Sequence, residues 1–119
     1  MEVQSFMFNI SSENPDRLLE FYRDVVALPP NPAMGPYVLM AANTPIIISE
    51  HSEVKGDAKE PQRGIFNFFV NDLAAEQSRM EGLGATFIRT AGKAVWGGLI
   101  STFVDPDGNY GQLVEFKPE

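Results

Sequence analysis

Two polar positions near apolar strands have the residue types that chemistry needs, namely the only histidine and a glutamine near the end of the chain. His51 follows Glu50 directly after an apolar run. The pair could bind a metal ion, accept a proton or contact a substrate. The alternative is a solvated histidine at the start of a polar segment, because catalysis by histidine requires an orienting partner. The solvated interpretation is preferred, and His51 is kept among the candidate contacts.

Gln112 lies in YGQLVEF, whose alternation of apolar residues indicates a strand. Its amide carries donors and an acceptor and could contact a ligand, or it could be buried and satisfied by the backbone. The preceding run DPDGN, residues 105–109, favours a tight turn, since proline fixes φ and glycine accepts positive φ. We therefore assign DPDGN a structural role and keep Gln112 as the candidate for chemistry.

The elements that would position these residues repeat along the chain. MFNI at 7–10 has a counterpart in IFNF at 65–68, and helix-start residues follow each segment. A helix is predicted over 15–28, after the cap-forming Asn14, and a weaker one over 72–84. Further strands are predicted at 37–41 and 46–50 in the first half, and at 86–90, 99–104 and 110–116 in the second.

The polar, breaker-rich stretch after the first set of strands reads as a connection between two halves. We expect a single domain over 1–119, with one module at about 1–52, a linker at about 53–63 and a second module at about 64–119. One such unit would leave a sheet face uncovered, so two units must pack together or pair with a partner.

Composition limits the possible partners. The chain has 119 residues, of which 44% are hydrophobic, enough for one domain with a core, and it has no cysteine for a disulfide or a thiolate metal site. It shows no apolar stretch of membrane-spanning length and no secretion signal, so we expect a cytoplasmic protein. The net charge of −7 argues against nucleic acid. The expected partners are a small molecule and a second copy of the chain, in a homodimer, with neither nucleic acid nor membrane.

Three stretches together resemble one known family. NPDRLLEFYRDVVAL, the tripeptide WGG at 96–98 and FVDPDGNYGQLVEF are similar to the glyoxalase/bleomycin resistance/dioxygenase superfamily, also called vicinal oxygen chelate proteins. The resemblance covers essentially the whole chain. It implies an α+β fold of two βαβββ modules that form a cupped, half-open mixed β-barrel. In that family the cup holds a small ligand and a divalent metal that binds neighbouring substrate oxygens.

The resemblance also implies where metal ligands would lie, on the first and last strands of each module. The matching positions are Met7, Ile65 and Gln112, with either Ile47 or, in a gapped reading, Glu50 as the fourth. Zinc, nickel and iron(II) require several imidazole, thiolate or carboxylate donors. A thioether is a poor donor, isoleucine is none and an amide brings no charge. We therefore expect no metal cofactor.

Other residues could line the implied cup. Asn9 and Asn67 alternate with apolar neighbours and could point into the cup or toward water. Trp96, before two glycines, could close the mouth of the cup or form an ordinary packing corner. The aromatic residues of the first strand of each module are predicted to lie in the core, and the alternative is that they line a ligand pocket. These residues are Phe6, Phe8, Phe66 and Phe68.

The leading functional prediction is a small-molecule-binding protein that holds an organic ligand in an apolar cup without the usual metal. Sequestration, as in the bleomycin-resistance branch, needs only such a cavity. The alternative is a metal-dependent lyase or dioxygenase of the glyoxalase type, with ligands such as Glu50, His51 and Gln112; metal-free catalysis is a third possibility. No catalytic residue is identified. The candidate ligand contacts are Gln112, Met7, Asn9, Ile65, Asn67, Trp96, Glu50 and His51.

Overall fold

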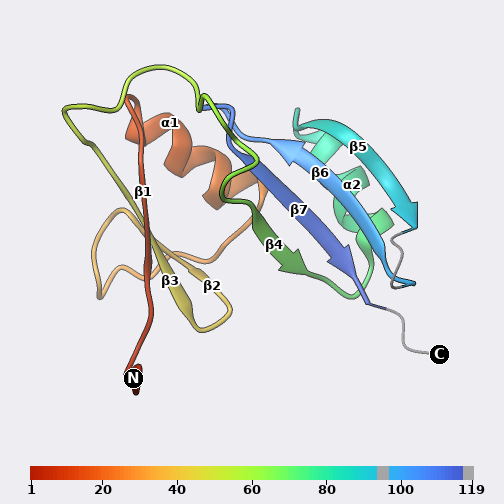
Figure 1. Ribbon diagram of the computed structural model, residues 1–119, viewed down its shortest axis with the longest axis horizontal. Helices are drawn as coiled ribbons and strands as arrows, with labels where there is room; N and C mark the ends of the chain where they lie inside the picture. The colour runs from red at the N-terminus through yellow and green to blue at the C-terminus, as the bar shows by residue number, and fades with distance from the viewer. Residues whose placement is uncertain (94–96, 117–119) are drawn as a thin grey trace. The chain divides into compact units, whose positions relative to one another are not determined.

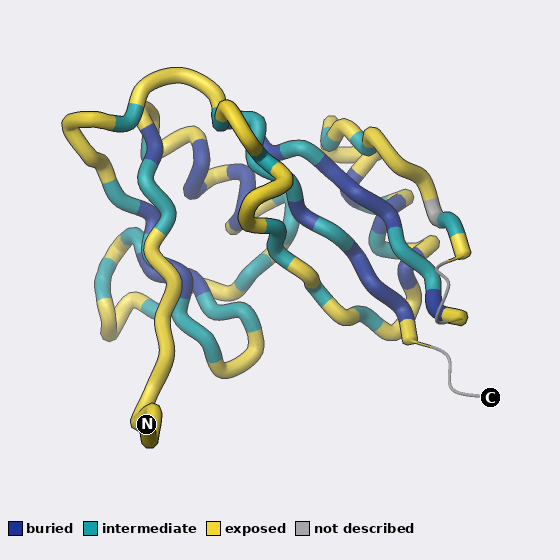
Figure 2. Tube along the Cα trace, viewed as in Figure 1, coloured by how far each residue is buried: buried dark blue, intermediate teal, exposed yellow. Residues whose placement is uncertain are grey.

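The computed structural model describes residues 1–93 and 97–116. The chain forms two compact units, Met1–Gly56 and Asp57–Glu119, and their boundary falls inside the segment predicted as a linker. Figure 2 shows that segment as mostly exposed chain. Among the described residues, no helix has the length and apolar character needed to span a bilayer.

The first unit is a three-stranded sheet with a helix on one face (Figure 1). The strand order is β1-β3-β2, with β1 parallel to β3 and β2 antiparallel to it. The strands and helical segments are β1 (Phe8–Ser11), α1 (Pro15–Glu20), the π-helical turn η1 (Phe21–Val25), β2 (Val38–Ala41) and β3 (Thr44–Ser49).

The predicted helix over 15–28 is shorter and changes type. Asn14 caps its start, accepting a hydrogen bond from the backbone N–H of Arg17 at 3.2 Å. After Glu20 the turn widens, and the N–H of Val26 bonds to the carbonyl of Phe21 at 3.0 Å. Ala27 then takes a φ of 72°, a left-handed conformation that stops the helix.

The first unit has one regular strand fewer than the expected βαβββ module. The missing strand survives as an isolated bridge between Pro30 and Leu39, with backbone hydrogen bonds on either side. Its sequence, LPPNP at 28–32, explains the difference, because proline has no N–H to donate to a ladder. The residue pattern predicts two strands after this helix, and the structure has these two, with the remaining strand of the family's module reduced to the bridge.

The second unit contains the full βαβββ order. Its four-stranded sheet has the order β4-β7-β6-β5, in which β4 runs parallel to β7 and the other pairs are antiparallel (Figure 1). The elements are β4 (Phe66–Phe69), α2 (Leu73–Gly82), β5 (Thr86–Lys93), β6 (Leu99–Val104) and β7 (Tyr110–Glu115). Two helices with two mixed sheets confirm the predicted α+β class.

Each unit buries its apolar side chains between helix and sheet. In the first unit the buried residues include Leu18, Tyr22, Leu39, Ile46 and Ile48. In the second unit Leu73 and Met80 of α2 are buried with Phe103 and Leu113 of the sheet. The ring of Phe103 stacks on Phe68, with centroids 6.3 Å apart, and meets Phe87 edge-on at 5.8 Å.

The core interpretation of the predicted aromatic residues is correct for only part of the set. Phe66 and Phe68 are half-buried and lie 5.9 Å apart. Phe6 and Phe8 are 65% and 41% exposed, so the core interpretation is wrong for them. The physical reason is their place at and before β1, the end strand of its sheet, where one side of the strand lacks a neighbour in the described unit.

Candidate functional site

Strand register brings three polar side chains side by side on the second sheet. Asn67 of β4 pairs with Gln112 of β7, and Gln112 pairs with Thr102 of β6. Directly paired residues point to the same side of a sheet. Their neighbours Leu113 and Phe103 point to the other side, where α2 packs. The polar side chains therefore lie on the face away from α2, which we call the open face and define by Asn67, Gln112 and Thr102.

The position of α2 is fixed by a buried hydrogen bond at its start. The backbone N–H of Leu73 donates to Oε1 of Glu115, on β7, at 2.9 Å. Glu115 is two residues from Leu113 along the strand and shares its side of the sheet. The carboxylate of Glu115 thus satisfies one of the free N–H groups at the start of the helix. The same bond holds α2 on the side of the sheet to which Leu113 points.

The amide of Gln112 is held by a side chain and not by the backbone. Its Nε2 donates to Oγ1 of Thr102 at 3.3 Å. Thr102 is only 4% exposed, while Gln112 is half-buried. Within the described chain, the carbonyl oxygen of Gln112 accepts no hydrogen bond, so this acceptor remains free for a donor group of a ligand.

Asn67 completes the row at the end strand of the sheet. It is exposed, and its Nδ2 donates to the carbonyl of Ile65 at 3.3 Å. Ile65 directly precedes β4 and is half-buried. Of the candidate residues in the second unit, the structure therefore brings Asn67 and Gln112 together directly, with Ile65 as a backbone partner of Asn67.

The first unit contains a parallel arrangement on its own sheet. Asn9 of β1 pairs with Ile47 of β3, as Asn67 pairs with Gln112 in the second unit. The hydroxyl of Ser49 donates to Oδ1 of Asn9. In each unit the first strand lies parallel to the last, so the register makes Ile47 the counterpart of Gln112. Glu50, the other alternative, follows the end of β3 and is exposed.

Two of the remaining candidates, Met7 and His51, lie outside regular strands. Met7 precedes β1 and is 47% exposed. His51 is exposed, and its Nδ1 accepts a hydrogen bond from the backbone N–H of Glu53 at 3.1 Å, which ties the imidazole into a local turn. Trp96 lies outside the described residues.

The residues at the family's metal positions do not fit a divalent ion. Ile47 and Ile65 have no donor atom, Met7 has a weak thioether, and the amide nitrogen of Gln112 is directed at Thr102. Over residues 1–93 and 97–116, no three side chains of the metal-binding types lie close enough together to hold a metal ion.

A separate hollow lies at the start of α2. Its volume is about 430 Å³, and it is lined by Phe69, Val70, Asn71, Asp72 and Glu76. Both carboxylates already have structural partners, since Asp72 accepts from the N–H of Ala75 at 3.0 Å and Glu76 pairs with Arg79 at 3.0 Å. The hollow is open to solvent, and its two carboxylates are already engaged, so it has fewer groups available to bind a ligand than the polar row has.

Thr102 is a residue that the sequence reasoning missed, although a signal was present. The turn at 105–109 places Val104 opposite Tyr110, and stepping back two residues along each strand places Thr102 opposite Gln112. A hairpin register drawn from the predicted turn would have found the pair.

The glyoxalase-like domain family matches this sequence over residues 7–114. Among the curated proteins searched, none matches it. Solved structures match across nearly the whole chain. A member of the glyoxalase/bleomycin resistance protein/dioxygenase superfamily from Sphaerobacter thermophilus has a TM-score of 0.74 and 18% identity, covering 97% of this chain and 98% of that one.

Two further structures support the same fold. A lactoylglutathione lyase from Agrobacterium tumefaciens has a TM-score of 0.70 and 19% identity, covering 97% of this chain and 95% of that one. A glyoxalase/bleomycin resistance protein/dioxygenase family enzyme from Burkholderia phytofirmans has a TM-score of 0.74 and 17% identity, covering 92% and 95%. Identities this low show a shared fold alone. Together with the family match, they confirm the resemblance seen in the sequence: the chain belongs to the glyoxalase-like domain family and has the fold of that superfamily.

Proposed function

We propose that this protein binds a small organic molecule against the open face of its second sheet, without a divalent metal at the family's positions. The observation that carries the proposal is the Gln112–Thr102 pair, an uncharged polar pair whose free acceptor stands where relatives are expected to place a metal ligand. Ile100, a half-buried apolar neighbour on the same face, would supply contact area for an organic ligand.

The pairing with Thr102 gives the glutamine amide a defined orientation. Because Nε2 is directed at the buried hydroxyl, Oε1 is the atom left to contact a ligand. A hydrogen bond to this oxygen gains strength if the ligand excludes water from the sheet. The ligand should therefore combine an apolar body with an N–H or O–H donor.

The test uses N-phenyl-1-naphthylamine, an uncharged fluorescent dye with an apolar body and one N–H donor. Untagged protein treated with a chelator should bind the dye, and the side-chain amide signals of Gln112 should shift in a ¹⁵N correlation spectrum. Gln112→Leu should weaken binding about three- to tenfold, the effect of one net hydrogen bond. Gln77→Leu is the matched control, since Gln77 is a buried glutamine of α2, the helix on the opposite face.

Two results would reject the proposal. The first is an absence of dye binding to the folded wild-type protein. The second is an equal loss of affinity in the Gln112→Leu and Gln77→Leu variants, which would place the dye elsewhere or indicate a general loss of structure.

We also propose a homodimer. The support is exposed apolar side chains on the end strands of both sheets, Phe8 on β1 and Phe69, 72% exposed, on β4. Light scattering during size-exclusion chromatography should give twice the chain mass of 13.2 kDa. Replacing Phe8 and Phe69 with serine should shift the mass toward the monomer, and a monomeric wild-type protein would contradict the dimer.

A further inference from the structure

The polar row of the open face continues onto a fourth strand and ends in a cation. Arg89 of β5 pairs with Thr102, so the register reads Asn67, Gln112, Thr102 and Arg89 across the sheet. Two register irregularities flank the arginine, one between Phe87 and Arg89 and one between Arg89 and Gly92. β-Bulges of this kind are common beside functional sites, where they redirect a side chain.

The first irregularity changes which side of the sheet Arg89 faces. Phe87 pairs with Phe103 on the helix side, and the two rings lie 5.8 Å apart. Simple alternation would return Arg89 to that same side two residues later. The extra residue in β5 instead sets Arg89 opposite Thr102, on the open face.

The guanidinium of Arg89 lies beside Gly92. A Cβ placed on Gly92 would lie 3.9 Å from both Nε and Nη2 of Arg89, so the guanidinium lies on the Cβ side of that residue. Gly92 pairs with Ile100, which faces the open side together with Thr102. This contact and the register therefore place the Arg89 side chain on the same face.

Arg89 also differs from three of the other arginines, because no carboxylate of the described chain pairs with it. Arg23, Arg63 and Arg79 each form an ion pair with a nearby acid. Over the described chain no ion pair forms at Arg89, which is exposed, and no carboxylate is among the residues paired across the open face. In a chain with 16 acidic and 9 basic residues, an arginine left without an acid is noteworthy.

We propose that the ligand of the open face is an organic oxyanion, whose carboxylate, sulfonate or phosphate group is bound by Arg89. This proposal rests on the proposed function, because it assigns the charge of the molecule that contacts Gln112. The planar guanidinium matches two oxygens of such a group with parallel hydrogen bonds. Because Arg89 lies on β5 and Gln112 on β7, the anionic group of the ligand would lie over β5 and its donor group over β7.

The experiment compares two dyes that differ in one group. 5-Anilino-1-naphthalenesulfonate has the aromatic body and N–H donor of N-phenyl-1-naphthylamine and adds a sulfonate on the opposite side of the ring system, so the anionic group and the N–H donor point in opposite directions across the sheet. Arg89→Gln should weaken binding of the sulfonate dye about ten- to a hundredfold, the range for a charge-assisted hydrogen bond, and leave the neutral dye unaffected. Arg89→Lys should recover part of the loss, since it restores charge without the planar fork.

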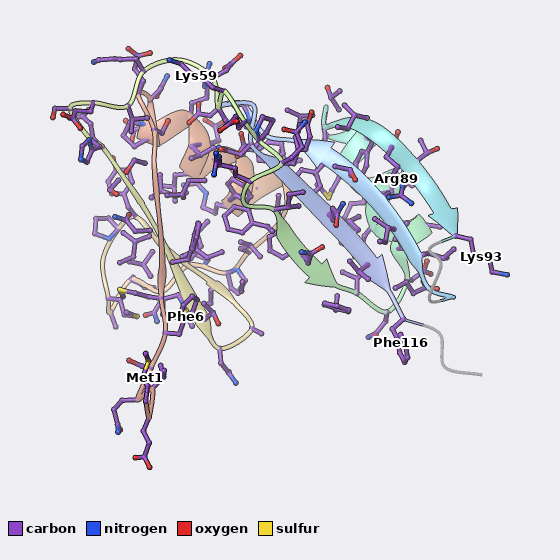
Figure 3. All side chains as sticks on the ribbon, in the orientation of Figure 1. Met1, Phe6, Lys59, Arg89, Lys93 and Phe116 are labelled. Atoms are coloured by element: carbon purple, nitrogen blue, oxygen red, sulfur yellow. The ribbon has the colours of Figure 1, made fainter. Side chains whose placement is uncertain are left out.

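Lys93→Gln is the matched control, because it removes one exposed positive charge from the same strand (Figure 3). Lys93 pairs with Leu99, outside the polar row, so its loss should change the affinity of either dye less than twofold. Circular dichroism and melting temperature should show that each variant is folded.

The possible outcomes separate the two proposals. If wild-type protein binds the neutral dye but not the sulfonate dye, or if Arg89→Gln weakens the sulfonate dye no more than Lys93→Gln, the anion assignment is wrong and the proposed function stands. If folded wild-type protein binds neither dye, the proposed function fails, and the anion assignment fails with it.

Discussion

At the scale of single residues, Gly111 allows the sheet to pack beneath the open face. A Cβ at this position would lie 2.3 Å from Cζ of Phe103, the fully buried ring on the neighbouring strand. Gly111→Ala should therefore lower the free energy of unfolding by about 1–3 kcal/mol, the usual cost of overpacking a core. Urea denaturation of wild-type and variant protein measures this difference.

Gly64→Ala serves as the control for Gly111→Ala. A Cβ on Gly64 would meet no atom within 4 Å, and its φ is not positive, so its stability should change little. Combining Gly111→Ala with Phe103→Leu should cost less than the two single changes summed, because the smaller side chain removes the collision. Equal effects at Gly64 and Gly111 would show that the ring contact does not constrain this strand.

Tyr37 provides a titration test in the first unit. The phenol donates a hydrogen bond to Asp16 at the start of α1, and this bond, with the charge of Asp16, raises the pKa of Tyr37 above its usual 10.0. A raised pKa in the folded state means that the interaction stabilises the fold below pH 10 and is lost as pH rises through the raised pKa. NMR of ¹³C-labelled tyrosine should show that Tyr37 titrates at a higher pH in the folded protein than in the unfolded chain.

Asp16→Asn should return the pKa of Tyr37 toward its usual value, since it removes the charge that opposes the phenolate. Asp24→Asn removes the same charge from a carboxylate that pairs with Arg23, and should leave the titration of Tyr37 unchanged. If the two variants affect Tyr37 alike, general charge and not the Asp16 contact is responsible.

At the scale of elements, the β2–β3 hairpin has a residue poorly suited to its turn. Ala41 pairs with Thr44, so Ala42 and Asn43 form a two-residue loop, and Ala42 has a φ of 52°. Two-residue turns with positive φ at the first position alone favour glycine there. Ala42→Gly should raise the free energy of unfolding by about 0.5–1 kcal/mol, since the relief of strain exceeds the added entropy of the unfolded chain.

Ala41→Gly should have the opposite sign, because Ala41 is the last paired residue of β2 and has no positive φ that glycine would relieve, and glycine in a strand costs up to about 0.5–1 kcal/mol relative to alanine. Thermal and urea unfolding of both variants would measure the contrast. A loss of stability in Ala42→Gly would show that the turn does not strain Ala42.

Much of the element order could be predicted from sequence, because it depends on local patterns. Alternation of apolar residues and turn residues such as Gly108, with a φ of 80°, fixed the hairpin before β7. The π-helical turn after Glu20 could not be predicted, since no residue type specifies it. The reduced strand near Pro30 could have been, because three prolines in five residues cannot form a ladder.

The site was predictable only in part, because some of its residues follow local sequence patterns and others depend on register between strands. Gln112 stood out as a polar residue in an apolar strand, and hairpin register leads from it to Thr102. Arg89 could not be found, because periodicity assigns it to the helix side and the irregularities in β5 reverse that assignment. Register shifts depend on packing across strands and leave no reliable local signal.

At the scale of the whole molecule, the connection between the units should be the first site of proteolysis. Lys55, Lys59 and Arg63 are exposed and lie at or near the boundary between the units. Exposed connections without regular structure fit a protease better than paired strands do. Limited trypsin digestion followed by mass spectrometry should therefore yield fragments that begin between residues 56 and 64.

Replacing Lys55, Lys59 and Arg63 with glutamine should protect the chain at equal trypsin concentration, while Lys93→Gln should not. First cuts at Lys93 or Arg89, within β5, would contradict the expectation and show that this strand opens more readily than the connection.

Membership of the glyoxalase-like domain family fixes the fold of this protein more firmly than its chemistry, because one fold supports many functions. The residues of the open face determine what this protein can bind. Gln112 and Thr102 are uncharged and bonded to each other, and the corresponding position in the first unit is an isoleucine.

The most direct test of this account is the metal content of untagged protein, measured by elemental mass spectrometry together with binding of N-phenyl-1-naphthylamine before and after chelation. We predict that the protein contains no stoichiometric divalent ion. We also predict that its affinity for the dye is the same before chelation as after chelation and removal of the chelator. A stoichiometric ion whose removal abolishes dye binding, and whose return shifts the side-chain amide signals of Gln112, would contradict the account.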